Sequence, residues 1–434
     1  MNADNFLKKN SVEIGQLIEL KSDKNYKGNV VNTKDNILAL KLSNGYNIGI
    51  DVSKIKSIKK LSQVKKVGKA EKKKFEIKKG LPTISILHTG GTIASRVDYR
   101  TGGVVSAFDP EDLVTMFPEL AEIANIQSDL IANMWSDDLR FDHFGIIAKA
   151  IEKEVNAGSQ GAIIGMGTDN LAVAACAMAF VLEELPIPVI FVGAQRSSDR
   201  GSSDAAMNMI CAARFITESD FSGVAICMHS STNDDCCDIL PACKTRKMHT
   251  SARNAFKAIN DTPIARVDYR NNKIEFIKKD YAKKNPEIKL VIKNKFEEKT
   301  GILKIHINMF PEQFAFYRKE KYKGLVIEGT GLGQTPGHVP TEHCKVHKKI
   351  FDEIEALSKD CVVVMTSGCI KGRVNMNVYD KARDLQERSV IPGEDMFSET
   401  AFVKLAWLLS NYKKEKVKEL ISKNLRGEIT ERTI

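Results

Sequence analysis

Hydrophobic positions follow two different patterns along the chain, and the change falls near residue 81. Before it, short apolar runs at residues 16–21, 28–32, 37–42 and 46–52 are separated by polar turns such as Asn44-Gly45. Strands this short and this closely spaced are typical of a small β-barrel of the SH3 kind. The first unit of the chain is therefore predicted to be all-β.

After residue 81, apolar runs alternate with longer helical patterns. Strands are expected at residues 83–87, 161–165, 188–192 and 224–228, and helices at residues 171–185 and 203–215. A repeated strand–loop–helix order predicts a parallel α/β sheet, in which functional residues gather in the loops after the strands. A charged stretch near residues 270–300 is interpreted as a linker. It leads to a second α/β unit with strands at residues 303–307, 324–327 and 361–366, and helices at residues 347–357, 401–410 and 414–422.

Charge separates the all-β unit from the rest of the chain. From Lys54 to Gly80 the chain is rich in lysine, which is typical of a linker or a basic arm. We place the β-barrel at residues 1–60, the linker at 61–80, and the two α/β domains at 81–290 and 298–434. Residues 1–80 hold 19 lysines, no arginine and 8 acidic residues, so their net charge is +11 (19 − 8), whereas the net charge of the whole chain is +10. This excess fits a polyanionic partner such as nucleic acid, and it equally fits a solvated linker.

Candidate chemistry lies in three loops of the first α/β domain. The loops contain Thr89-Gly90-Gly91-Thr92, Gly167-Thr168-Asp169 and Thr245-Arg246-Lys247. A hydroxyl nucleophile needs a titratable partner that takes its proton and a donor pocket for the oxyanion. Each motif alone is weak, because a Gly-Thr-Asp sequence is usually a turn and a helix cap. The three motifs in this order predict a threonine-based acyl-transfer site.

These motifs resemble those of the bacterial-type L-asparaginases over residues 81–434. The segment from Leu81 to Ala94 is similar to the family's first signature, and Gly167-Thr168-Asp169 is similar to its second. Arg246-Lys247-Met248-His249-Thr250 resembles the loop of the catalytic lysine. Trp135-Ser136-Asp137-Asp138 resembles the loop that holds the substrate's α-carboxylate. The resemblance implies a two-domain asparaginase-like α/β core with parallel sheets that forms homodimers.

A closer resemblance is to the D subunits of archaeal glutamyl-tRNA(Gln) amidotransferases, which join a small N-terminal β-domain to an asparaginase core. The residues that carry it are the segment 42–50, Tyr99 to Val104, Arg246 to Phe256 and the tail from Arg426 to Thr433. The resemblance implies a glutaminase that supplies ammonia to a GatE-like partner subunit in a heterodimer or a dimer of heterodimers. That partner uses ATP and Mg to convert Glu-tRNA(Gln) to Gln-tRNA(Gln), and this chain needs no cofactor of its own.

The same resemblance assigns a role to each candidate residue. It implies that Thr92 is the nucleophile on glutamine, although Thr168 remains an alternative. Thr168, Asp169 and Lys247 are implied to relay protons and activate water. In substrate binding, Tyr99 is implied to close over the site and to orient the nucleophile. Ser136 is implied to hold the carboxylate of glutamine, and Asp169 or Asp137 its amino group. Two positions depart from the second signature, namely Met166, where histidine is usual, and Asn170, where threonine is usual.

Two other functions stay open. A free-standing L-asparaginase or glutaminase would keep the core chemistry but has no need of a basic β-module. A nucleic-acid-binding protein with an inactive core would not need Thr92, Thr168, Asp169 and Lys247 together. No apolar run reaches the length of a membrane span and no signal peptide is evident, so a cytoplasmic location is expected. His343 and His347 have metal-ligand spacing but lack a third ligand, so no metal site is expected.

Overall fold

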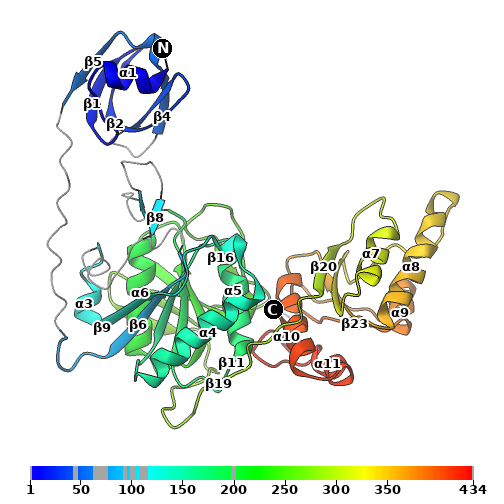
Figure 1. Ribbon diagram of the computed structural model, residues 1–434. Helices are drawn as coiled ribbons and strands as arrows, with labels where there is room; N and C mark the ends of the chain where they lie inside the picture. The colour runs from blue at the N-terminus through cyan, green and yellow to red at the C-terminus, as the bar shows by residue number, and fades with distance from the viewer. Residues whose placement is uncertain are drawn as a thin grey trace.

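The computed structural model describes residues 2–42, 47–61, 77–90, 95–97, 104–106, 116–196 and 202–432, without the side chains of residues 47, 95–97 and 104–106. These residues build a five-stranded unit, an α/β domain around an eight-stranded sheet, and a second α/β domain around a four-stranded sheet (Figure 1). Within these ranges no helix combines the length and the apolar character that crossing a membrane requires.

The N-terminal unit is an antiparallel sheet with the strand order β4-β3-β2-β1-β5. Alternate positions of its strands face inward, and Ile18, Leu20, Leu38 and Leu40 are almost completely buried there. The predicted N-terminal β-unit is confirmed as an antiparallel sheet, to which one helix is added. Its elements are α1 (Ala3–Lys9), β1 (Leu17–Lys21), β2 (Asn25–Lys34), β3 (Ile37–Leu42), β4 (Asn47–Asp51), η1 (Val52–Lys54) and β5 (Ser57–Lys60).

The sequence pattern does not predict two elements of this unit, α1 and β5. Helix α1 is capped by the Asn2 side chain, which accepts a hydrogen bond of 2.9 Å from the Asn5 amide, and it buries Phe6 against the sheet. Strand β5 lies at the start of the lysine-rich stretch, inside the range of 1–60 given to the β-barrel, but the pattern of apolar runs does not show it. Only Ile58 is apolar there, and the strand forms because its backbone pairs with β1, placing Ile58 opposite Leu20.

The first α/β domain has the strand order β18-β17-β14-β13-β12-β10-β6-β9. Strands β9, β6, β10, β12 and β13 are parallel, as predicted, whereas β14, β17 and β18 add an antiparallel extension. The strands are β6 (Thr83–His88), β9 (Asn125–Leu130), β10 (Ala162–Gly165), β12 (Pro188–Val192), β13 (Gly223–His229), β14 (Cys236–Pro241), β17 (Ala265–Asp268) and β18 (Lys273–Phe276).

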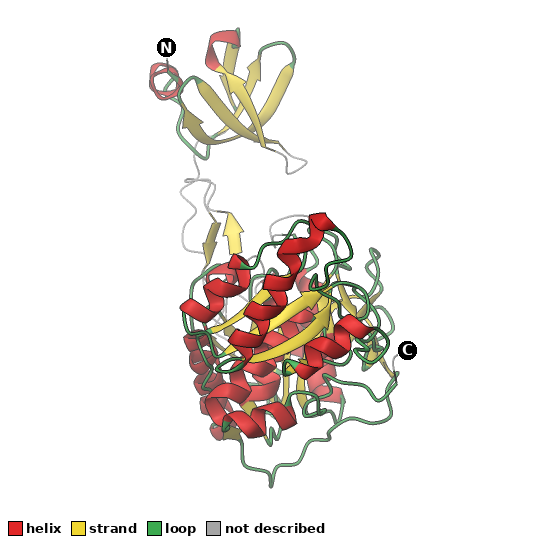
Figure 2. Ribbon diagram, turned by 90° about the vertical axis from the view of Figure 1, so that its right-hand side faces the viewer, coloured by secondary structure: helices red, strands yellow, loops and turns green. Residues whose placement is uncertain are grey.

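Helices cover both faces of this sheet (Figure 2). Leu87, Ile164 and Phe191 point to the face covered by α4 (Phe141–Asn156) and α5 (Leu171–Val181). Their chain neighbours Ile86, Ile163 and Ile190 point to the face covered by α3 (Leu120–Ile123) and α6 (Ala205–Glu218). Strands buried on both faces read as continuous apolar runs, which is why the sequence shows them clearly.

Short pairs of strands complete this domain, and they fall where the sequence pattern is least regular. The predicted helix at residues 171–185 ends earlier, because residues 182 and 183 form an edge strand. The charged stretch near residue 270, interpreted as linker, contains β18. The short strands are β7 (Ser95–Val97) with β8 (Val104–Ser106), β11 (Leu182–Glu183) with β19 (Val291–Ile292), and β15 (Thr245–Lys247) with β16 (Phe256–Ala258); 3-10 turns are η3 (Ser136–Asp138) and η4 (Ala242–Lys244).

The second α/β domain is a parallel sheet of order β20-β21-β22-β23. The first predicted strand begins three residues too late, and the pattern does not show α7, α9 or β23, which are short. The elements are β20 (Thr300–Lys304), α7 (Glu312–Lys319), β21 (Gly324–Gly329), η5 (Glu342–Cys344), α8 (Lys345–Ser358), β22 (Val362–Ser367), α9 (Asp380–Glu387), β23 (Val390–Pro392), α10 (Ser398–Asn411) and α11 (Lys414–Leu420).

The two α/β domains share one core where α5 meets α10. Phe180 of α5 lies against Trp407 of α10, with ring centroids 5.5 Å apart. Beside this contact, the fully buried ammonium of Lys244 in the first domain lies 2.6 Å from the fully buried carboxylate of Asp395 in the second. Asp395 also accepts hydrogen bonds from the Thr430 amide, at 3.1 Å, and from the Thr430 hydroxyl. The structure tolerates this ion pair away from solvent because the two hydrogen bonds from Thr430 satisfy the Asp395 carboxylate as well.

We predict that Asp395→Ala lowers the free energy of unfolding by about 3–5 kcal/mol, because it leaves the Lys244 ammonium buried without its partner. Urea and thermal unfolding of Asp395→Ala, of a control variant and of the wild type measure the effect. The control is Glu353→Ala, which removes the half-exposed partner of Arg318 and should cost at most about 1 kcal/mol. Equal costs for the two substitutions would contradict the structural role of Asp395.

Candidate active site

The loops that follow β6 and β9 meet at the carboxyl edge of the sheet. The Thr89 amide donates to the Gly165 carbonyl at 2.9 Å, and the Met134 amide donates to the Thr89 carbonyl at 3.1 Å. Gly90 has a φ of +97°, and a Cβ atom there would lie 2.8 Å from the Met134 carbonyl oxygen. A glycine is therefore required at this turn, which brings the start of the Gly-Gly-Thr loop against its neighbour.

Lys247 joins two of the predicted site residues. Its Nζ atom lies 2.9 Å from Thr168 Oγ1 and 2.8 Å from Asp169 Oδ1. Thr168 and Asp169 lie between β10 and α5, whereas Lys247 comes from hairpin strand β15. The Lys247 side chain is 16% exposed and that of Asp169 is 69% exposed, so the carboxylate is open to a bound molecule while the ammonium is largely enclosed.

Gly193 and the α5 helix set the position of the threonine. A Cβ atom at Gly193 would lie 2.8 Å from Thr168 Cγ2, so only glycine leaves room for that methyl group. Asp169 lies two residues before the first residue of α5, where the positive end of the helix dipole favours a negative charge. Local packing and helix electrostatics therefore hold a hydroxyl and a carboxylate side by side.

Ser136 lies beside this loop, in the 3-10 turn η3. Its buried Oγ accepts hydrogen bonds from the amides of Asp169, at 3.1 Å, and Asn170, at 3.3 Å. Its hydroxyl hydrogen is thereby directed away from these amides. Gly167 permits the approach, since a Cβ atom there would lie 3.0 Å from Ser136 Oγ. The neighbouring Asp137 is exposed.

The two departures from the second signature differ in their surroundings. The Asn170 side chain donates to the Ser136 carbonyl oxygen at 2.8 Å, so the carboxamide fastens the η3 turn to the Thr168 loop. Met166 is buried in the apolar core between the sheet and α5. Neither residue displaces Thr168, Asp169 or Lys247 from the cluster.

Two predicted residues, Thr92 and Tyr99, lie outside the residues that the structure describes. The other five are placed: Thr168, Asp169 and Lys247 are in direct contact, Ser136 contacts the same loop through backbone amides, and Asp137 lies at the exposed side of η3.

Sequence reasoning missed Glu399, at the start of α10. Its Oε1 atom lies 2.9 Å from Arg246 Nη2, next to Lys247 in the chain. Together with α5 and β15, the start of α10 encloses a cavity of about 200 Å³ that Asp169 and Lys247 also line. The sequence pattern gives no sign of Glu399, because its contact with Arg246 crosses the two domains.

Comparisons with known proteins match this architecture domain by domain. Residues 83–282 match the family model "Asparaginase, N-terminal", residues 299–421 match "Glutaminase/Asparaginase C-terminal domain", and residues 12–61 match "GatD N-terminal domain". The L-asparaginase from Thermococcus kodakarensis has the same fold, with a TM-score of 0.72 and 24% identity over 81% of this chain and 100% of its own. L-asparaginase I from Vibrio cholerae gives a TM-score of 0.69 at 24% identity, over 81% of this chain and 99% of its own. The α/β domains therefore have the asparaginase fold.

Curated relatives extend the match to nearly the full length. The D subunit of glutamyl-tRNA(Gln) amidotransferase from Pyrococcus abyssi is 42% identical over 99% of this chain and 98% of its own. The protein of the same name from Methanococcus maripaludis strain S2 is 41% identical over 97% of this chain and 99% of its own. The chain belongs to the family of glutamyl-tRNA(Gln) amidotransferase D subunits, which combine an asparaginase-type amidohydrolase core with their own N-terminal domain.

His88, at the end of β6, predicts a dependence of stability on pH. Burial lowers the pKa of this imidazole to about 4, from 6.5 in the unfolded chain, so the folded protein holds it neutral. The unfolded state therefore binds a proton first as the pH falls. Stability that is present above pH 6.5 should be lost progressively down to about pH 4, by about 3 kcal/mol.

The free energy of unfolding, measured by urea denaturation from pH 7.5 to 4, tests this prediction. The wild type should lose stability over that range more steeply than His88→Leu, which removes the titrating group. Parallel pH profiles for the two proteins would show that His88 does not carry the effect.

Proposed function

We propose that this chain is the glutaminase subunit of a tRNA-dependent amidotransferase and hydrolyses glutamine to glutamate and ammonia. The observation that carries the proposal is the contact of Lys247 Nζ with both Thr168 Oγ1 and Asp169 Oδ1, in a chain of the D-subunit family. A GatE-like partner uses the ammonia, with ATP and Mg, to convert Glu-tRNA(Gln) to Gln-tRNA(Gln). The D subunits pair with one another through their asparaginase cores.

The chemistry is acyl transfer to a threonine hydroxyl. Thr92 Oγ1 attacks the side-chain carbonyl carbon of glutamine, the carbon–nitrogen bond breaks, and the nitrogen takes a proton and leaves as ammonia. Water then attacks the resulting ester and releases glutamate. Thr168, Lys247 and Asp169 pass the protons, which their hydrogen-bonded contacts at 2.8–2.9 Å support. Thr168 is the alternative nucleophile.

Substrate recognition uses the same loops. The Ser136 hydroxyl donates to the α-carboxylate of glutamine, because its oxygen already accepts from two amides. Asp169 contacts Lys247 through Oδ1, and its exposed side chain offers the second oxygen to the substrate ammonium. Asp137, exposed beside Ser136, is the second candidate for that contact. Tyr99 closes over the bound substrate and orients the nucleophile.

Lys247→Met should lower kcat for glutamine by about 10²–10⁴-fold, because it removes the proton-carrying ammonium while keeping the length of the side chain. Ammonia release is measured from glutamine and from asparagine, for the chain alone and with its partner and Glu-tRNA(Gln). Wild-type glutamine turnover should rise when partner and tRNA are present. Lys319→Met, on the exposed side of α7, is the matched control and should keep wild-type turnover.

Two outcomes would contradict the proposal. Turnover by the chain alone that favours asparagine and ignores tRNA would identify a free-standing L-asparaginase. Full glutamine turnover by Lys247→Met would remove the relay from the mechanism.

The N-terminal unit supports an RNA-containing complex rather than a free-standing enzyme. Lys27 of β2 and Lys59 of β5 both lie opposite Glu19 of β1, and Lys21 lies two residues further along β1 on the same face. All three lysines are exposed. Lysines contact phosphates as point charges without reading bases, so this face suits the backbone of a bound tRNA.

Replacing Lys21, Lys27 and Lys59 together by Ala should weaken binding of Glu-tRNA(Gln) to the complex. The slope of the logarithm of affinity against the logarithm of salt concentration should fall by about 1 for each phosphate that the variant no longer neutralises. Binding is measured by fluorescence anisotropy of labelled tRNA at several salt concentrations. The control replaces three exposed lysines of α7 and α8, namely Lys319, Lys348 and Lys349. Equal effects of the two triple variants would show that only net charge matters.

A further inference from the structure

Lys247 is carried by an isolated two-stranded hairpin. Strands β15 and β16 pair only with each other among the described strands, and a lone hairpin is marginally stable in water. The loop between them is closed at its base by the Met248 amide, which donates to the Ala255 carbonyl at 2.6 Å. The position of the Lys247 ammonium therefore depends on what fastens this hairpin to the main sheet.

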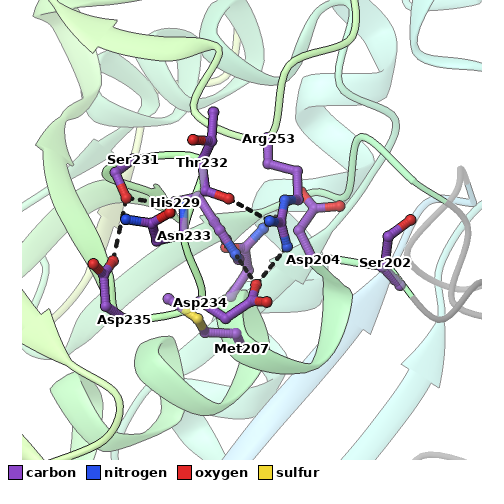
Figure 3. Close-up of polar contacts among 12 residues, drawn as sticks. Ser202, Asp204, Met207, His229, Ser231, Thr232, Asn233, Asp234, Asp235 and Arg253 are labelled. Carbon is purple, nitrogen blue, oxygen red and sulfur yellow. Dashed lines mark hydrogen bonds and ion pairs between the residues drawn. The ribbon is translucent and has the colours of Figure 1, made fainter.

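Two cations of the hairpin fasten it to the loop between β13 and β14. The Arg253 guanidinium donates to the Asp234 carboxylate through Nη1 and to the Thr232 carbonyl through Nη2, as Figure 3 shows. Lys257 Nζ donates to the Ser230 carbonyl at 2.8 Å. The Arg253 side chain is only 16% exposed, so its planar fork is held on two acceptors in a largely enclosed setting.

The contact continues inward from Asp234. His229 Nε2 lies 3.4 Å from Asp234 Oδ1, and His229 Nδ1 lies 2.6 Å from Asn208 Oδ1 (Figure 3 shows His229 and Asp234). The Asn208 amide group donates to the Gly193 carbonyl, at 3.0 Å, so its oxygen is the acceptor and His229 Nδ1 is the donor. Burial lowers the pKa of His229, so the neutral imidazole presents Nε2 to Asp234 as an acceptor, and Arg253 is the cation that pairs with the Asp234 carboxylate.

The hydrogen bonds from His229 through Asn208 end beside Thr168, the other member of the relay. Gly193 is the residue whose missing Cβ makes room for the Thr168 methyl group. Asp204 strengthens the same turn, since its buried carboxylate accepts from the amides of Gln195 and Arg196 at 3.0 Å. Arg253 therefore fastens the Lys247 hairpin to the loop that follows β13, and the hydrogen bonds of His229 at the end of β13 lead through Asn208 to the turn beside Thr168.

We propose that Arg253 is a positioning residue: through the Asp234 carboxylate and the Thr232 carbonyl it holds the Lys247 hairpin against the loop between β13 and β14, so that Lys247 Nζ stays within hydrogen-bond distance of Thr168 Oγ1. The catalytic consequence rests on the proposed glutaminase function. Arg253 does not contact the substrate in this role. It fixes the geometry of a proton transfer, for which a displacement of about 1 Å can cost about 100-fold in rate.

Arg253→Ala should lower kcat for glutamine about 10-fold to 100-fold in the full complex and leave KM within about twofold, because proton transfer is affected and substrate binding is not. Arg253→Lys should recover part of the loss, since an ammonium reaches Asp234 but cannot also hold the Thr232 carbonyl. Arg318→Ala, which breaks a partly exposed pair with Glu353 on α7 and α8, is the matched control and should leave both constants unchanged.

A crystal structure of Arg253→Ala gives a readout that does not depend on the substrate. The distance from Lys247 Nζ to Thr168 Oγ1 should exceed hydrogen-bond range, compared with 2.9 Å in the parent chain. An unchanged distance, an unchanged kcat, or a rise in KM alone would each overturn the proposal. If Arg253→Ala does not fold, Arg253→Lys and Asp234→Asn carry the same measurements. A wild-type complex that fails to hydrolyse glutamine would refute the proposed function, while the measured distance would still decide the positioning role.

Discussion

The contact between the Lys247 ammonium and the Thr168 hydroxyl is the constraint on which the rest of the site depends. The two residues are 79 positions apart and come from a hairpin and from a strand-end loop. An ammonium can exchange protons with a hydroxyl only within hydrogen-bond distance, so both elements must be fixed to a common frame. The parallel strands supply that frame, because their carboxyl ends bring the loops after β6, β9 and β10 to one edge.

Charge burial fixes the second domain against this frame. The pair of Lys244 and Asp395 and the pair of Lys404 and Glu428 are both without solvent exposure. Desolvation lowers the pKa of Lys404, while the Glu428 carboxylate at 2.7 Å opposes that shift. Glu428 also accepts hydrogen bonds from the amides of Leu425 and Arg426, and the Arg426 side chain reaches Glu183 in the first domain. The C-terminal tail therefore links the domains through satisfied charges rather than through apolar burial alone.

The chain differs from the solved L-asparaginases in what surrounds a common core. Those structures align over their full length with 81% of this chain, so the β-unit at residues 17–60 is an addition to the fold. Within the core, Asn170 shows how a departure from a signature can be structural, since its carboxamide holds the Ser136 turn. Met166, at the other departure, packs into the apolar core. Thr168, Asp169 and Lys247 remain in direct contact beside both of these residues.

The sequence by itself determined the β-unit, the α/β domains and their buried parallel strands, because each apolar run consists of neighbouring residues. It also determined the residues Thr168, Asp169 and Lys247, because each of them belongs to a short motif. It did not determine β5, β18, the antiparallel extension or the end of α5, because these elements depend on backbone pairing with distant strands. The contacts of Arg253 with Asp234 and of Arg246 with Glu399 join segments that no local pattern relates. Which charges are buried, and which groups satisfy them, was decided only by the tertiary structure, since desolvation and hydrogen bonding depend on everything that packs around a group.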